Sequence, residues 1–391
     1  MTTASETEHV PLSTIAREWT RMGVIGFGGP PTHISLLRKL CVQQRDWIAA
    51  DEFEDAIAAC NLLPGPASTQ LAIWCGRRLR GPAGAVLAGF CFIFPGLLMI
   101  LALSTLFLAA HPPKFVLGLA AGAGAAVPAV AVHAAWGLAP ASWKRIQNNK
   151  VSHPARTRWI AYAAVGAAAA ALIGPYLVLV LIACGALEIA VRSHSRTTPT
   201  LASVLPLAVS TVTAGGLGAL AWEALKVGAL SYGGGFVIIP LMQHDAVHTY
   251  HWMTDARFLD AVALGQITPG PVVLTVAVIG YAASGYAGGL LAVLVAFAPS
   301  FLFILFGARY FATLRANARV QAFLTGAGPA VIGAIAGSAI PLALALSHGW
   351  QYPLLAAAAI WLFLARRGVV SALLISAAIG AACALSGLTV S

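Results

Sequence analysis

The amino-acid sequence predicts an all-α polytopic membrane protein made of two inverted-topology repeats whose helices are broken by glycine and proline. Composition is the first observation behind this prediction, because 59% of the 391 residues are hydrophobic and only 9% are charged. Soluble globular proteins are about 45–50% apolar. Apolar runs of about 17 to 25 residues, the length that crosses a bilayer, recur from Ala83 onward. Since lipid offers backbone polar groups no partner, these runs are expected to be helices.

An internal repeat is the second observation. With an offset of 205 positions, residues 23–66 align with residues 228–271 without a gap. The identical pairs include Gly28/Gly233, Gly29/Gly234, Trp47/Trp252, Asp55/Asp260 and the tripeptides Pro64-Gly65-Pro66 and Pro269-Gly270-Pro271. We therefore expect a first repeat over residues 1–195 and a second over residues 222–391. A linking transmembrane helix is expected between them, over residues 196–221.

Within the first repeat, the pattern predicts two kinds of segment. Broken helices are expected over residues 12–30 and 53–76. Longer spans are expected near residues 83–109, 115–139, 159–173 and 175–191.

The charges in the loops are the third observation, because cytoplasmic loops carry an excess of Lys and Arg. Three arginines precede the span near residues 83–109, whereas three arginines follow its counterpart near residues 288–308: Arg77, Arg78 and Arg80 against Arg309, Arg315 and Arg319. The two repeats are thus expected to face opposite ways, with a cytoplasmic N-terminus and a periplasmic C-terminus. Topology also accounts for most of the net charge of +10, so no nucleic-acid partner is predicted.

No metal site, cofactor or enzyme is predicted. The six cysteines are scattered without C-x-x-C or paired Cys/His spacing, which is typical of free structural residues. None of the ten histidines forms an H-E-x-x-H motif, and neither G-x-S-x-G nor a Walker loop occurs. The expected partners are the lipid bilayer and a small ion, and the sequence leaves a homodimer open.

The candidate substrate site is the pair of Gly/Pro-interrupted stretches, which are the segments most alike between the halves. Broken helices expose backbone N–H groups, and the N-terminus of a resumed helix attracts an anion. Transporters place binding sites at such interruptions, although glycine and proline also serve simply to kink or pack helices. The substrate-binding candidates are Gly28, Gly29, Asn61, Pro64, Gly65, Pro66, Ser68 and Thr69 in the first half, and Gly233, Gly234, Gly235, Gln266, Pro269, Gly270 and Pro271 in the second.

Four ionisable residues near these stretches complete the candidates. Arg21 and Lys226 stand seven residues before Gly28 and Gly233, where each would either neutralise a dianion or extend from a helix end to the interface. Asp55 and Asp260 stand nine residues before each Pro-Gly-Pro. They are candidates for a proton or charge relay, with a helix N-terminal charge as the structural alternative.

These motifs together resemble the chromate ion transporter family in its long, two-domain form. The resemblance rests on Phe27-Gly28-Gly29-Pro30, Leu63-Pro64-Gly65-Pro66, Tyr232-Gly233-Gly234-Gly235 and Thr268-Pro269-Gly270-Pro271, and it covers nearly the whole chain. It implies export of chromate across the bacterial inner membrane and a role in chromate resistance. The repeat and the broken helices predict that the protein is a secondary transporter that works by alternating access. Sulfate-like oxyanions are alternative cargo. A passive anion channel is the first alternative function, and a polytopic membrane enzyme is the second.

Overall fold

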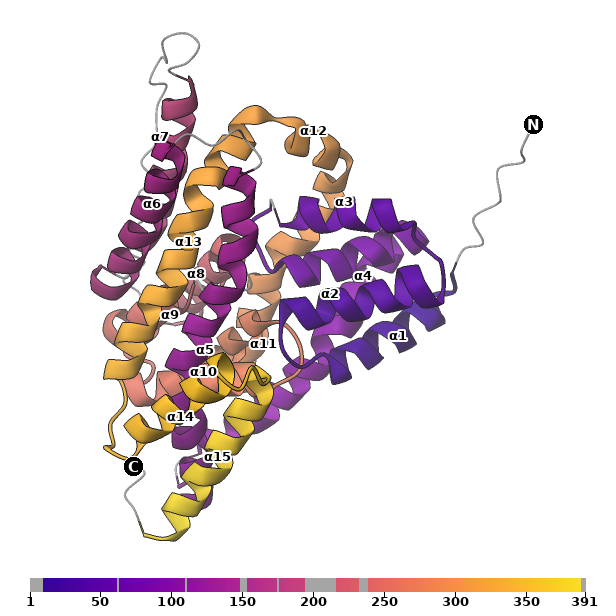
Figure 1. Ribbon diagram of the computed structural model, residues 1–391. Coiled ribbons are helices and arrows are strands. Elements are labelled where there is room, and N and C mark those ends of the chain that lie inside the picture. The colour runs from indigo at the N-terminus through magenta and orange to yellow at the C-terminus, as the bar shows by residue number, and fades with distance from the viewer. Residues whose placement is uncertain are drawn as a thin grey trace, which may run out of the picture.

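Every regular element that the computed structural model describes is a helix (Figure 1). The described residues are 10–61, 63–109, 111–147, 153–173, 176–193, 216–231 and 238–387. The first half contains α1 (Leu12–Ile25), α2 (Pro30–Arg38), the π-helix η1 (Lys39–Gln44), α3 (Ala50–Cys60), α4 (Ala67–Phe107), α5 (Lys114–Gln147), α6 (His153–Leu172) and α7 (Leu177–Ser193). The second contains α8 (Leu217–Leu230), α9 (Ile239–Gln243), the π-helix η4 (His244–Thr249), α10 (Asp255–Ile267), the 3-10 helix η5 (Val272–Leu274), α11 (Thr275–Gly307), η6 (Ala308–Tyr310), α12 (Phe311–Ala316), α13 (Ala318–Leu344), α14 (Gln351–Phe363) and α15 (Val369–Leu385).

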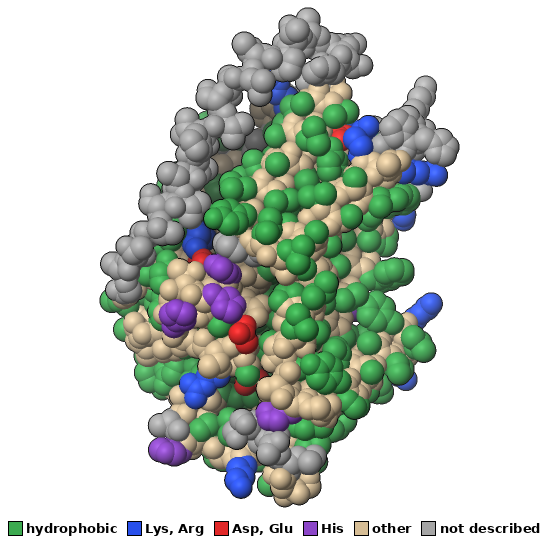
Figure 2. Space-filling model, turned by 90° about the vertical axis from the view of Figure 1, so that its left-hand side faces the viewer, with side chains coloured by type: hydrophobic (Ala, Val, Ile, Leu, Met, Phe, Trp, Pro, Cys, Tyr) green, Lys and Arg blue, Asp and Glu red, His purple; other side chains and the backbone are tan. Residues whose placement is uncertain are grey.

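Four of the described segments are long and apolar enough to cross a membrane. They are Ala67–Phe107, Lys114–Lys144, Val272–Gly307 and Ala318–Leu344. Large apolar side chains such as Leu172, Leu294 and Leu344 are more than two-thirds exposed. Figure 2 shows apolar side chains spread over the described helices of one face, with few charged groups among them. Exposed apolar surface on this scale needs lipid around it, so the protein is an integral membrane protein.

The same unusual backbone features recur at an offset of 205 residues. The π-helices η1 and η4 occupy matching positions, and each is followed by a non-glycine residue with positive φ, Asp46 at 48° and His251 at 53°. Such φ values are uncommon outside glycine. The two halves therefore follow the same backbone path through these segments.

The predicted linking helix falls mostly outside the described residues, which resume at residue 216. Its last residues, from Leu217 to Ala221, open α8. At the repeat offset α8 matches α1, so these residues belong to the second half and that half begins earlier than residue 222.

Helices α4 and α11 each reverse direction about a third of the way along their length. Gly81 has φ 62° and ψ −152°, and Gly285 has φ 62° and ψ −151°. A Cβ atom on Gly76 would lie 2.4 Å from the carbonyl oxygen of Gly84. A straight helix would hold these positions about 12 Å apart, so the two pieces of α4 pack together as a hairpin. Residues 67–79 span only about 20 Å, whereas residues 82–107 span about 39 Å and are long enough to cross a bilayer.

The longer pieces of α4 and α11 pack against each other across the two halves. A Cβ atom on Gly89 of α4 would lie 2.4 Å from Phe301 of α11, and one on Gly289 of α11 would lie 2.6 Å from Leu101 of α4. Residue numbers rise along one helix as they fall along the other at these contacts. The two equivalent helices are therefore antiparallel.

The remaining helices interlock the halves through small residues. Helix α5 packs against α14 and α15 of the second half, while α13 packs against α6 and α7 of the first, and α5 and α13 lie side by side (Figure 1). At one crossing, a Cβ atom on Gly122 would lie 2.2 Å from the carbonyl oxygen of Ser376. Such close backbone approach is the usual way in which membrane helices gain packing contacts.

A buried carboxylate joins α6 to α7. Glu188 receives hydrogen bonds from Arg158 at 3.0 Å, Arg192 at 2.8 Å and Tyr162 at 3.2 Å. Glu188→Ala is expected to lower the free energy of unfolding by about 3 kcal/mol, because it leaves cations unpaired in a partly buried site. Thermal unfolding in detergent measures this loss. Glu52→Ala is the matched control, since the Glu52–Arg78 pair is exposed and is expected to contribute less than about 1 kcal/mol.

Candidate functional site

The two Pro-Gly-Pro turns bring the halves into direct contact. The N–H of Gly65, in the turn between α3 and α4, donates to the carbonyl oxygen of Ser231 at 2.6 Å. The N–H of Gly270, in the turn after α10, donates to the carbonyl oxygen of Gly26 at 3.0 Å. Moving Gly26 and Gly65 by 205 positions gives Ser231 and Gly270, so the two hydrogen bonds are equivalent. Each turn is thus held by the end of the first helix of the other half.

Positive φ angles make glycine necessary at these contacts. Gly65 and Gly270 have φ values of 118° and 112°, and Gly28 and Gly29 have values of 100° and 73°. Side chains rarely adopt this region of backbone conformation. The segment at Gly28 and Gly29 connects α1 to α2 and lies close to the second turn, since a Cβ atom on Gly29 would meet Val272. The candidates Gly233, Gly234 and Gly235 lie outside the described residues.

A buried histidine that the sequence reasoning missed links the turns. The Nε2 atom of His33 lies 2.9 Å from the carbonyl oxygen of Gly26, and its Nδ1 atom lies 3.1 Å from the hydroxyl of Ser68. Because a carbonyl only accepts, the neutral ring donates from Nε2 and receives the Ser68 hydroxyl at Nδ1. The carbonyl of Gly26 thereby joins His33 to the second turn. The internal repeat does not single out His33, because the equivalent residue in the second half is Ile238.

Buried polar atoms without partners lie near the two turns. Within the described part of the chain, five side-chain atoms here have no hydrogen-bond partner: Thr69 Oγ1, Gln70 Oε1, Ser231 Oγ, Gln266 Nε2 and Ser300 Oγ. Ser300 faces the first turn, since a Cβ atom on Gly65 would lie 3.0 Å from its hydroxyl oxygen. Unpaired buried polar groups are costly and call for a ligand or water. Thr69 and Gln266 were predicted from sequence, whereas Gln70, Ser231 and Ser300 were not.

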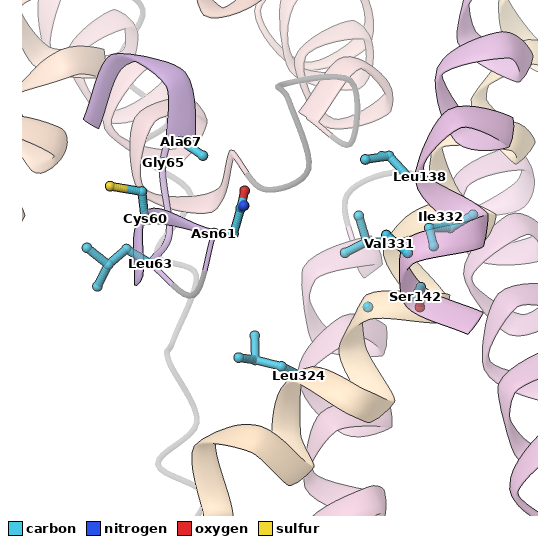
Figure 3. A pocket seen from close by; sticks show the side chains of 12 residues that line it. Cys60, Asn61, Leu63, Gly65, Ala67, Leu138, Ser142, Leu324, Val331 and Ile332 are labelled. Carbon is cyan, nitrogen blue, oxygen red and sulfur yellow. The ribbon is translucent and has the colours of Figure 1, made fainter. Parts of the chain in front are cut away.

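A cavity of about 150 Å³ opens beside the first turn, with Asn61 and Gly65 on one wall and residues of α5 and α13 on the other. In Figure 3 the Asn61 amide extends from the turn into the space that Leu138 and Val331 border on the far side. Since a water molecule occupies about 30 Å³, the cavity has room for a small ion and a few waters. The two turns differ in exposure, because Pro64 of the first turn is exposed whereas Pro269, Gly270 and Pro271 of the second are all buried.

The structure places the predicted charged residues away from this cavity. Arg21 lies on α1 with its side chain 70% exposed, 3.8 Å from Glu18. Lys226 is paired with Glu223 at 2.6 Å and with Asp245. Neither cation lines the cavity.

The two repeated aspartates differ in their surroundings. Asp55 is exposed on α3, whereas Asp260 on α10 faces α5, with its Oδ1 atom 3.2 Å from the Cβ position of Gly124. The equivalent carboxylates therefore do not share one environment.

Comparison with known sequences identifies the family. Residues 13–189 and 218–384 match the profile of the chromate transporter family, one segment in each half. The chain belongs to the chromate transporter family. It is 31% identical over 360 residues to a chromate transport protein of Cupriavidus metallidurans, covering 88% of this chain and 86% of the relative. It is 32% identical over 364 residues to a chromate transport protein of Pseudomonas aeruginosa, covering 87% and 84%. No solved structure matches the chain.

Proposed function

We propose that this protein is a secondary transporter that exports chromate, or a similar tetrahedral oxyanion, across the bacterial inner membrane. Membership of the chromate transporter family supports the cargo. The observation that carries the proposal is the reciprocal pair of hydrogen bonds between the Pro-Gly-Pro turns and the first helices of the opposite halves. Such a crossing of two repeats at interrupted helices is where secondary transporters bind their substrates.

The anion site is proposed at the first turn, facing the cavity. Asn61 supplies an amide there, Thr69 and Ser300 supply unpaired hydroxyl groups nearby, and Gly65 lets the backbone come close. Neutral hydrogen-bond donors of this kind stabilise an anion without a full positive charge, so the anion can also dissociate. Arg21 and Lys226 are not part of this site, because both are already paired with carboxylates.

Alternating access is proposed to arise because the two halves have opposite orientations in the membrane. Loop charges favour inverted repeats, and the antiparallel packing of α4 against α11 supports the same relation. In this arrangement the short hairpins reach part-way into the membrane from opposite sides, with a cytoplasmic N-terminus and a periplasmic C-terminus. The first turn is open to a cavity while the second is buried, and an exchange of these two states would move the opening to the other side.

Transport by inside-out vesicles tests the proposal. Vesicles containing the protein are expected to accumulate labelled chromate, and sulfate is expected to compete more strongly than phosphate. Imposed pH and potential gradients identify the driving force. Absence of both chromate and sulfate uptake above that of empty vesicles would refute the proposal, and currents of many ions per opening in a bilayer recording would favour a passive channel instead.

A further inference from the structure

A buried cluster of three charged side chains lies in the second half, outside the proposed anion site. Glu223 and Lys226 are on α8, and Asp245 is on the π-helix η4. Lys226 Nζ lies 2.6 Å from Glu223 Oε2 and also pairs with Asp245. The Glu223 side chain is fully buried, and its Oε1 atom has no hydrogen-bond donor within the described part of the chain. Two carboxylates thus share a single ammonium group.

The cluster has one negative charge more than its single ammonium group can balance. With all three groups ionised it carries a net charge of −1, in a place where even Lys226 is only 15% exposed. An uncompensated charge that is removed from water is strongly unfavourable. A proton on one carboxylate oxygen would make the cluster neutral and leave the other carboxylate paired with Lys226.

The equivalent position in the first half is built differently. Glu18 and Arg21 match Glu223 and Lys226, but Leu40 stands where the second half has Asp245. Glu18 lies within 4 Å of three guanidinium groups whose side chains are about half exposed or more, those of Arg17, Arg21 and Arg45. Carboxylates are in excess in the second cluster alone, so only that cluster offers a place for a proton.

Within the described part of the chain, no Lys or Arg other than Lys226 forms an ion pair with Glu223 or Asp245. On η4, the Thr249 hydroxyl donates to Asp245 at 3.2 Å. His244 and Tyr250 are the titratable neighbours there, and the ring of His244 lies 5.7 Å from that of His248. Helix α11, which packs against α8, carries no Asp, Glu, Lys or Arg along Thr275–Gly307. Its two tyrosines, Tyr281 and Tyr286, contact each other near the reversal of that helix.

The cluster is connected to the first Pro-Gly-Pro turn through the end of helix α8. Helix α8 ends at Leu230, and the next residue, Ser231, accepts the hydrogen bond from Gly65. Lys226 is five residues before Ser231, which is about 7.5 Å along the helix axis. A shift of α8 that follows a change in the ion pair would therefore move the carbonyl group that holds the turn at the proposed anion site.

We propose that Glu223 and Asp245 form one proton-binding site, and that the gain and loss of this proton accompanies movement of the transported anion. The inference rests on the proposed function. Binding forms one O–H bond to a carboxylate oxygen with a proton from water, and release reverses it, so no other reactant is needed. Because linkage is reciprocal, a proton that changes anion binding must itself be bound differently when the anion is present.

Proton movement in liposomes tests this assignment. The full chain is reconstituted with a pH-sensitive dye inside, the membrane potential is clamped, and a chromate gradient is imposed. We expect protons to move with chromate, and the number of protons per chromate to fall at least about tenfold in Glu223→Gln and Asp245→Asn. Glu18→Gln is the matched control, since it makes the same change at the equivalent position, and it should keep the ratio of the unaltered chain.

The outcomes separate the two proposals. Unaltered ratios in Glu223→Gln and Asp245→Asn would overturn the inference, as would loss of proton movement in Asp260→Asn alone. If the unaltered chain moves chromate without protons, the inference fails and the proposed function stands; this result does not depend on how the variants fold. If the unaltered chain moves no chromate, the proposed function itself fails.

Discussion

Gly65→Leu is expected to abolish chromate transport while leaving the protein folded. Gly65 has a φ of 118°, and a Cβ atom there would lie 2.5 Å from Gln70 Nε2 and 3.0 Å from Ser300 Oγ. A larger side chain must displace the amide that now donates to the Pro64 carbonyl at 2.7 Å and must extend into the proposed anion site. The strain at one positive-φ residue costs about 1–3 kcal/mol, which is small against the packing of a large helical protein. Vesicle uptake and size-exclusion chromatography measure the two effects separately.

Gly81→Leu is the matched control for this change. Gly81 also has a positive φ, of 62°, but nothing lies within 4 Å of its Cβ position. The same strain without a clash at the turn should leave most of the transport activity. Full activity in Gly65→Leu would show that the site lies elsewhere, whereas equal losses in Gly65→Leu and Gly81→Leu would show that backbone strain, not the site, is responsible.

Much of the fold could be predicted because apolar runs and the internal repeat are visible in the sequence. Runs of apolar residues predict the long helices, and the pairing of each Pro-Gly-Pro with its counterpart predicts that both turns are alike. The reversals at Gly81 and Gly285 were signalled only by the match of Gly81-Pro82-Ala83-Gly84 to Gly285-Tyr286-Ala287-Gly288. That match gave the position of an equivalent feature without showing that the chain turns back there.

The candidate site was predictable only in part, since its decisive contacts are made by the backbone. The hydrogen bonds from Gly65 and Gly270 to distant carbonyl groups leave no pattern in the side chains. The sequence does carry one signal for the charged residues. Glu18 and Glu223 each stand three residues before the basic residue of their half, a spacing at which side chains on a helix pair. This spacing predicts that Arg21 and Lys226 form ion pairs with these glutamates rather than bind an anion.

Gly333→Leu is expected to prevent stable folding, because it would separate two helices that join the halves. A Cβ atom on Gly333 of α13 would lie 1.8 Å from the carbonyl oxygen of Ala163 on α6. A backbone atom cannot rotate away, so the helices must move apart and lose the packing that membrane helices depend on. Overpacking usually costs about 1–3 kcal/mol, and a clash with backbone should reach or exceed the upper end of that range.

Thermal unfolding in detergent and the yield of monodisperse protein measure this effect, with Gly328→Leu as the control on the same helix. The nearest atom to a Cβ on Gly328 is the Ser142 hydroxyl oxygen at 3.8 Å, an ordinary contact beside the cavity. Gly328→Leu should therefore fold with nearly the melting temperature of the unaltered chain, whatever it does to transport. A melting temperature for Gly333→Leu as high as that of the control would contradict the close crossing of α6 and α13. The contact between these two helices would then not be what holds the two halves together.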